Sequence, residues 1–189
     1  MHSLFKGAIA EQFICELPTD EDKAAALDAF LAEHKSEIAG IVTEPLVQGA
    51  GGMLFHSPIS LKLLRNLADK HGILLLVDEI FTGFGRTGTM FACEQEGVAP
   101  DLLCLGKGLT GGYLPVAATL ATDEIYAAFL GDYTDLKTFF HGHTFTGNPL
   151  GCAAALATLG IFEKERTLDA LRPKIDRLRQ GLSHFESLA

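Results

Sequence analysis

Three charged side chains stand where apolar segments of the sequence end, and each could take part in chemistry. Asp78 is the first acid after the apolar run in "ILLLVDE", and Lys107 comes two residues after "DLLCL". Glu44 closes a third such segment, "IAGIVTE". In open α/β sheets, ligands bind beyond the carboxyl ends of the strands. We therefore expect Glu44, Asp78 and Lys107 to lie near a ligand.

An acid at a strand end has two common uses, to hold magnesium in a nucleotide hydrolase or to hold the ring of an organic cofactor. The hydrolase needs a preceding phosphate loop of the form GxxxxGK[ST]. Before Asp78, Gly and Lys are adjacent only at Lys6-Gly7, where the lysine comes first instead of the glycine. Gly106-Lys107 has the required order but comes after the acid. Gly108 also stands where that loop needs Ser or Thr. The order of the two segments and the residue types in the loop exclude a nucleotide hydrolase of this kind.

Pyridoxal phosphate is a cofactor that suits these residues. It needs a lysine that forms an imine with its aldehyde, a carboxylate against its ring nitrogen, and donors around its phosphate. Asp78 offers the carboxylate and Lys107 the amine, and the Gly-rich loops 82–88 and 106–112 allow the backbone to approach the cofactor. From spacing alone, a lysine that merely points into solvent from a loop stays an alternative.

Two longer stretches resemble the class III (omega) aminotransferases. They are "LLLVDEIFTGFGRTGTMFACEQEGVAPDLLCLGKGLTGGYLPVAATLAT" at residues 74–122 and "HGHTFTGNPLGCAAALATL" at residues 141–159, and the resemblance covers residues 36–165. Members of this family are fold-type I enzymes that use pyridoxal 5'-phosphate. The resemblance implies an α/β fold, a mixed and mostly parallel sheet between helices, and a homodimer with its site at the interface.

The resemblance also implies roles for individual residues. Lys107 would carry the cofactor and move the substrate proton, and Asp78 would pair with the ring nitrogen. Ile80 would pack flat on the ring, and Gln48 would lie near the ring hydroxyl.

The resemblance also implies roles for residues of the second stretch, 141–159. Thr144 would bind the cofactor phosphate across the dimer interface, close before the helix start at Asn148-Pro149. His143 would contact the cofactor through its backbone, and Gly142 would line the substrate pocket. His141 and His143 have the spacing of a metal pair, but no third ligand is placed by the sequence, so we expect no metal.

Two charged neighbours have less specific roles. Glu79 is expected to be a hydrogen-bonded neighbour of the site. Arg86 of the GFGRTG motif is expected in a structural or interface ion pair, with binding of a substrate carboxylate as the alternative.

The variants "EPLVQGAGGM" and "FFHGHTFTGNPLGCAAALATL" look most like the biotin-pathway members of the family. These transfer an amino group from adenosylmethionine or lysine to 8-amino-7-oxononanoate. The alternatives are another omega-aminotransferase, acting on ornithine, 4-aminobutyrate or a diamine, and a non-catalytic domain that keeps the fold.

Family members are more than twice as long as these 189 residues. We expect residues 1–165 to form part of the cofactor-binding large domain and residues 166–189 to begin the helical connection to a small domain. The chain alone should then have an incomplete site, weak or no turnover, and exposed apolar surface that favours association.

Composition narrows the partners. The formal charge is −9 and no Lys/Arg cluster interrupts it, which argues against nucleic acid. No apolar run reaches the roughly 18 residues of a membrane span, and the first residues lack a secretory signal. The four cysteines form no CxxC pair, and we expect buried, reduced thiols. These features predict a soluble protein of a reducing cytoplasm, and the resemblance implies a small-molecule amino donor and keto acceptor as partners.

The hydrophobic pattern predicts the elements that position these residues. Apolar strands between helices imply a parallel or mixed sheet covered on both faces. Pro173 interrupts the last helical pattern and is expected to mark a break or a second helix start. Helices are expected at residues 21–34, 60–70 and 149–164, and strands at 38–44, 73–78, 101–105 and 115–120.

Overall fold

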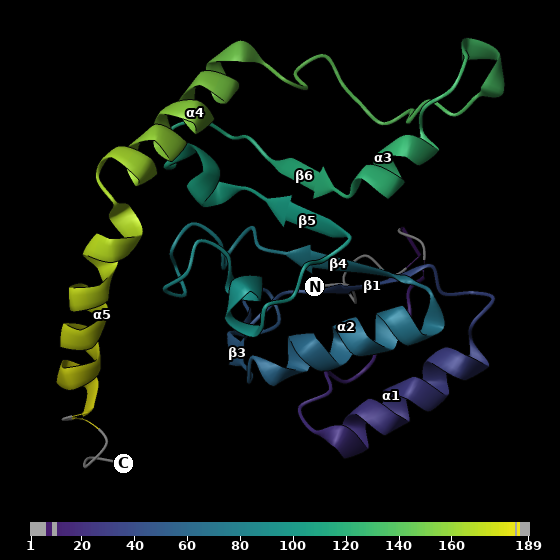
Figure 1. Cartoon of the computed structure of the whole chain (residues 1–189), viewed down its shortest axis with the longest axis horizontal. Coiled ribbons are helices and arrows are strands. Elements are labelled where there is room, and N and C mark those ends of the chain that lie inside the picture. Colours follow the sequence, from purple (N-terminus) through teal and green to yellow (C-terminus); the bar gives the residue numbers. More distant parts are fainter. Residues whose placement is uncertain (1–6, 9–10, 184, 186–189) are drawn as a thin grey trace. The chain divides into compact units, whose positions relative to one another are not determined.

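The computed structural model describes residues 7–8, 11–183 and 185 and shows an α/β protein (Figure 1). The helices are α1 (Glu21–Glu33), α2 (Ile59–His71), α3 (Asp123–Ala128), α4 (Pro149–Lys164) and α5 (Thr167–Ser183), with the short 3-10 helices η2 (Ala92–Glu96), η3 (Lys107–Thr110) and η4 (Tyr133–Asp135). The strands are β1 (Gly40–Thr43), β2 (Val47–Gln48), β3 (Leu54–Phe55), β4 (Leu74–Asp78), β5 (Leu102–Leu105) and β6 (Ala118–Ala121).

Four strands form one sheet in the order β1-β4-β5-β6, and β2 pairs with β3 in a separate ribbon. β1 and β4 are parallel, with Gly40 opposite Leu74 and Thr43 opposite Val77. Figure 1 draws β5 and β6 with arrows in opposite directions. The predicted mixed sheet with helices is confirmed.

The chain forms two compact units. The first comprises Met1–Asp78 with Cys93–Leu103, and the second comprises Glu79–Ala92 with Cys104–Ala189. The division passes through β5, so each unit contains part of this strand. The predicted boundary at residue 165 stays a prediction.

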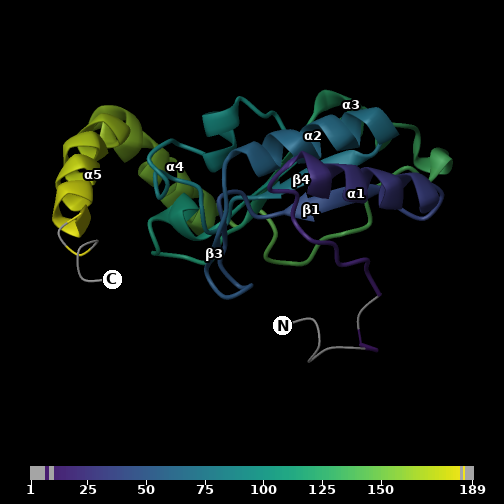
Figure 2. The same cartoon turned by 90° about the horizontal axis from the view of Figure 1, so that it is seen from below.

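The first unit has its core on one face of β1 and β4. α2 packs on these strands and α1 packs against α2 (Figures 1 and 2). The other face is open, since Val42 is 69% exposed and Leu74 is 38% exposed. The prediction of a sheet covered on both faces is therefore wrong for this chain. The side chains that fill the core are Leu27, Leu31, Leu61, Leu64, Leu67, Leu75 and Val77.

The helix ends follow the local signals in the sequence. Asp20 caps α1 by accepting the N–H of Lys23 at 2.9 Å, and Gly72 ends α2 in the left-handed conformation with φ 65°. Asn148 caps α4 by accepting the N–H of Gly151 at 3.0 Å, with proline at the next position. These groups satisfy backbone donors and acceptors that a helix end leaves unpaired.

The expected break at Pro173 is wrong, because α5 runs through it without interruption. Proline removes one helical hydrogen bond, but its fixed φ is compatible with a helix. Leu171 on one side of it reaches Gly85, where an added Cβ would lie 2.9 Å from Leu171 Cδ1. Ile175 on the other side reaches Gly88 in the same way, at 3.5 Å. Packing on both sides of the proline offsets the missing bond.

The cysteines are all free, but only Cys93 is buried. Cys104 is half-buried, and Cys15 and Cys152 are exposed. The prediction of buried thiols is therefore wrong for Cys15 and Cys152. Separately, none of the helices in the described part of the chain is long and apolar enough to cross a membrane.

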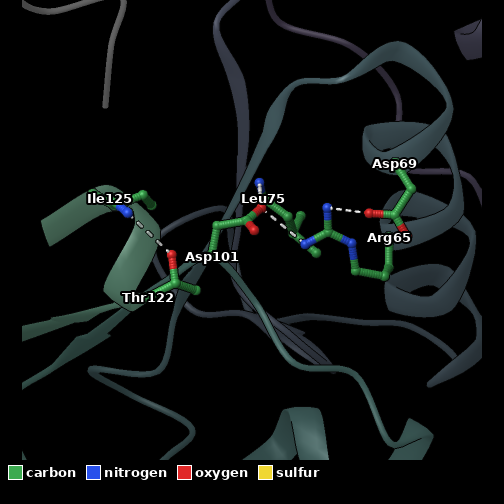
Figure 3. Close-up of polar contacts among 6 residues, drawn as sticks. All are labelled: Arg65, Asp69, Leu75, Asp101, Thr122 and Ile125. Atoms are coloured by element: carbon green, nitrogen blue, oxygen red, sulfur yellow. Dashed lines mark hydrogen bonds and ion pairs between the residues drawn. The ribbon is translucent and has the colours of Figure 1, made fainter. Parts of the chain in front are cut away.

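Asp101 joins the beginning of β5 to β4 within the first unit (Figure 3). Its Oδ2 accepts the N–H of Leu75 at 2.7 Å and Nη1 of Arg65 at 2.9 Å. Its own N–H donates to the Leu75 carbonyl at 3.0 Å. Burial, the largest influence, raises the pKa of Asp101, but the Leu75 N–H and the Arg65 guanidinium together lower this pKa below its usual value.

Replacing Asp101 with asparagine should destabilise the first unit by about 2 kcal/mol, because a charge-assisted hydrogen bond is lost. A carboxyl group whose pKa is lower in the folded state than its unfolded value of about 3.9 stabilises the fold at pH values above that value. This stabilisation is lost as the pH falls through the folded-state pKa. The difference in unfolding free energy between wild type and Asp101→Asn should therefore have its full value at pH 7 and shrink below about pH 4. Urea unfolding midpoints across this range measure it. Equal midpoints at pH 7 would contradict the prediction.

Candidate active site

Lys107 stands at the start of η3 in a strained backbone conformation. Its φ is 42°, in the left-handed region, and its side chain is exposed. For a residue with a Cβ, this conformation costs roughly 1–2 kcal/mol. Such strain persists where the surroundings impose it, and it gathers at functional sites. The lysine is therefore held in a place that glycine would suit better.

Packing in the second unit holds the backbone of this loop. Thr110 is buried, and its hydroxyl donates to the Leu114 carbonyl at 2.6 Å. The N–H of Leu109 donates to the Gly106 carbonyl at 3.0 Å, and α4 packs on η3. At Gly108 an added Cβ would lie 2.9 Å from Phe84 Cβ. The loop thus has little room to relax around the lysine.

A buried carboxylate organises the turn that follows β4. Glu79 and Thr82 are both fully buried, and the Thr82 hydroxyl donates to Glu79 Oε2 at 2.6 Å. The N–H of Glu79 donates to the Cys104 carbonyl at 2.9 Å, and the N–H of Gly83 donates to the Glu79 carbonyl at 2.9 Å. The expectation that Glu79 is a hydrogen-bonded neighbour agrees with this geometry. The turn places Ile80 and Phe81.

Ile80 and Phe81 bring this turn to the lysine loop. An added Cβ on Gly106 would lie 3.4 Å from Ile80 Cγ2, so Ile80 packs directly against the residue before Lys107. Nζ of Lys107 lies over the Phe81 ring, 5.0 Å from its centroid. The structure thus joins two predicted site residues, Ile80 and Lys107, and adds a third neighbour. The sequence pattern did not single out Phe81; its only signal is its place next to Ile80.

Arg86 also lies over the Phe81 ring. Its guanidinium carbon lies 5.2 Å from the Phe81 centroid. This aromatic contact does not test the expected ion pair of Arg86, structural or at an interface, which stays a prediction.

Asp78 and Gln48 belong to the first unit. Asp78 is the last residue of β4 and is half-buried. Gln48 ends β2, opposite Leu54, and its side chain lies over the next turn, where an added Cβ on Gly51 would be 3.5 Å from Oε1. Asp78 is at the strand end that the sequence predicted.

The later motif forms an exposed turn at residues 144–147. The N–H of His143 donates to Thr146 Oγ1 at 3.1 Å, and Nδ1 of His143 accepts the N–H of Phe145 at 3.1 Å. Thr144 is exposed, and an added Cβ on Gly142 would meet nothing within 4 Å. Both backbone groups of His143 are used locally, since its carbonyl accepts the N–H of Thr146.

The strain at Lys107 gives a stability prediction. Lys107→Gly should be more stable than Lys107→Ala by about 1 kcal/mol, because glycine adopts a positive φ without a steric cost. Thermal unfolding of the two variants measures the difference. As a control, the same pair at Lys62, an exposed residue inside α2, should show the reverse order. An alanine variant at position 107 as stable as the glycine variant would show that the strain is absent.

Comparison with known proteins places this geometry in context. A family model described as aminotransferase class III matches residues 1–188. The adenosylmethionine-8-amino-7-oxononanoate aminotransferase of Nitratidesulfovibrio vulgaris is 57% identical over 162 residues, which cover 86% of this chain and 30% of that protein.

Solved structures agree. The crystal structure of adenosylmethionine-8-amino-7-oxononanoate aminotransferase from Methanocaldococcus jannaschii superposes with a TM-score of 0.91 at 40% identity, over 98% of this chain and 43% of that one. An ornithine aminotransferase from Toxoplasma gondii, which has partial occupancy of PLP at its active site, gives 0.77 at 31% identity, over 97% of this chain and 41% of that one. The chain spans 30% to 43% of the length of the curated relatives it matches.

Proposed function

The chain belongs to the class III aminotransferase family, and we propose on this premise that it is part of an aminotransferase of biotin biosynthesis. The whole enzyme would move an amino group from adenosylmethionine or lysine to 8-amino-7-oxononanoate and form 7,8-diaminononanoate. The names of the relatives with 43% to 57% identity support this acceptor. Activity, substrates and dimer formation are proposed for the whole protein, because this chain spans less than half of those relatives.

The observation that carries the proposal is the strained, exposed Lys107 beside Ile80. Lys107 has glycine on both sides, and Ile80 packs against the first of these, Gly106, so a flat ring that carries an aldehyde can approach the amine. Pyridoxal 5'-phosphate has that form, and when bound it draws off the electron pair released from the substrate carbon. The residues present therefore fit this cofactor.

Each residue of the site then has a defined task. Lys107 would hold the cofactor through its side-chain nitrogen and, when free, would carry a proton to and from the substrate carbon. Asp78 would lie against the ring nitrogen, and Ile80 would pack on one face of the ring. Gln48 is proposed to lie by the ring hydroxyl.

The exposed turn of residues 144–147 is proposed to serve the second copy in a homodimer. Thr144 would offer its hydroxyl to the cofactor phosphate of that copy, and His143 would border the same group. Gly142, with open space on the side where a Cβ would project, would border the substrate.

An acceptor assay of the full-length protein tests this function. We expect amino transfer to 8-amino-7-oxononanoate at a higher kcat/KM than to simple keto acids, with adenosylmethionine and lysine compared as donors. A preference for the keto acids paired with ornithine, 4-aminobutyrate or a diamine would assign the protein to another branch of the family. No transfer by the cofactor-loaded protein to any acceptor would support a non-catalytic domain.

A further inference from the structure

We propose that Phe84 is a positioning residue that imposes the left-handed backbone of Lys107. The functional part of this inference rests on the proposed function, in which the Lys107 side chain takes part in the chemistry. Phe84 would act through the backbone of Gly108, the residue after the lysine, and not through the amine. It would thereby decide in which direction the lysine side chain leaves its loop.

The turn after β4 contacts the chain on both sides of Lys107. An added Cβ on Gly108 would lie 2.9 Å from Phe84 Cβ and 3.0 Å from Phe84 Cδ2, so this side chain lies directly against the backbone. On the other side, an added Cβ on Gly106 would lie 3.4 Å from Ile80 Cγ2. Because neither glycine has a side chain, both contacts reach the main chain and restrict the residue between them.

The need for glycine at position 108 comes from Phe84 and not from the local backbone. Gly108 is not among the glycines with a positive φ, so an alanine could adopt its backbone conformation. The space that an alanine Cβ would need is filled by the Phe84 side chain. The close approach of these two residues is therefore a specific feature of the lysine loop.

Phe84 is itself fixed in a strained conformation. Its φ is 58°, a second position in this unit where a side chain stands on a left-handed backbone. Its N–H donates to the Met90 carbonyl at 2.7 Å. Its ring makes T-shaped contacts with Phe91 and with Phe162 of α4, at centroid distances of 5.7 Å and 6.3 Å. A side chain fixed from several directions can hold the lysine loop in place.

One other contact could hold the backbone of Lys107. The N–H of Leu109 donates to the Gly106 carbonyl at 3.0 Å, and this bond lies wholly within the lysine loop. If it alone were responsible, the conformation of Lys107 would not depend on the side chain at position 84. Strain of this kind persists only where the surroundings over-determine it, which favours the contact from outside the loop. The two explanations predict opposite results for variants of Phe84.

A comparison of glycine and alanine at position 107 tests the inference without measuring turnover. The full-length apoprotein is unfolded in urea at one protein concentration, with Lys107→Gly and Lys107→Ala each made alone and combined with Phe84→Ala. With Phe84 present, the unfolding equilibrium constant of Lys107→Ala should be about 5-fold larger than that of Lys107→Gly. With Phe84→Ala this difference should fall below about twofold, because the loop can then relax to a negative φ.

Further variants separate the contact with Gly108 from a general loss of stability. Phe84→Gly removes the three atoms nearest to Gly108 and suits the φ of 58°, so it should abolish the difference as well. Phe84→Leu keeps atoms at the Cβ, Cγ and Cδ positions and should retain the difference. Phe30→Leu removes a ring that packs on Phe13 in the first unit. It should destabilise both variants of position 107 equally and leave their difference unchanged.

A kinetic measurement connects the backbone to the proposed chemistry. In the cofactor-loaded, full-length protein, Phe84→Ala should lower kcat by about 10–100-fold, because a displaced reacting group loses its alignment. The KM for the amino donor should stay at the wild-type value, since Phe84 is not proposed to bind substrate. Phe84→Leu should recover most of the rate.

The outcomes distinguish this inference from the proposed function. A glycine–alanine difference that stays about 5-fold in both Phe84→Ala and Phe84→Gly would reject the role of Phe84. So would a kcat of Phe84→Ala within about twofold of wild type. A wild-type protein that transfers no amino group would reject the proposed function, whereas a difference lost with Phe84 would still support its hold on the backbone of Lys107.

Discussion

Replacing Lys107 with alanine should lower the proposed amino transfer by the full-length protein by about 10⁴-fold or more. A positioned acid–base group alone contributes about 10²–10⁴-fold, and this lysine is also proposed to hold the cofactor covalently. Its strained φ of 42° gives the backbone no reason to keep a lysine there, which favours a chemical role.

Single-turnover kinetics with pre-loaded cofactor measure this loss, because they report the chemical step without product release. Lys107→Arg should be as impaired as Lys107→Ala, since guanidinium stays protonated and cannot act as a nucleophile. Lys164→Ala, at the end of α4, is the matched control and should retain the wild-type rate. A Lys107→Ala rate within tenfold of wild type would remove this residue from the chemistry.

Replacing Asp78 with asparagine should lower kcat/KM by about 10³-fold. A carboxylate about 4 Å from a charged ring nitrogen is worth about 4 kcal/mol at an effective dielectric constant of 20. Each 1.36 kcal/mol corresponds to about a factor of ten in rate. Asparagine keeps the size of the side chain at the end of β4 but loses the charge, so the ring would be a weaker electron sink.

Steady-state kinetics and the cofactor dissociation constant together check the Asp78 prediction. Asp78→Glu should recover part of the rate, because the charge is restored at a shifted position. Asp176→Asn, an exposed acid of α5 paired with Arg179, should change neither quantity. If Asp78→Asn weakened cofactor binding while kcat stayed at the wild-type value, the carboxylate would bind the ring without activating it.

Much of the local structure was predictable from short stretches of sequence. The cap at Asp20, the left-handed end at Gly72 and the start at Asn148-Pro149 each depend on groups within a few residues of one another. The strands that carry Asp78 and precede Lys107 are short apolar runs between turn residues. The family resemblance pointed to the same two residues, Asp78 and Lys107, through the sequence motifs that surround them.

The prediction that the sheet is covered on both faces failed for a physical reason. Apolar strands such as β1 show that both faces prefer to be buried, but they do not show what buries them. In this chain Val42 remains 69% exposed. The pattern describes the preference of the strand and does not identify an element that covers it.

Short-range patterns predicted helices at 21–34, 60–70 and 149–164 to within one residue at each end, and an acid and an amine after two apolar strands, but they did not predict α3, β2 or β3. Only the tertiary structure decided that α5 continues through Pro173, that Lys107 adopts a positive φ, and that Phe81 lies beneath its amine. Caps and periodicity act between near neighbours along the chain, whereas these outcomes depend on side chains that meet only after folding. Leu171 and Ile175 reach a loop more than 80 residues earlier, and Phe81 meets an amine 26 positions later.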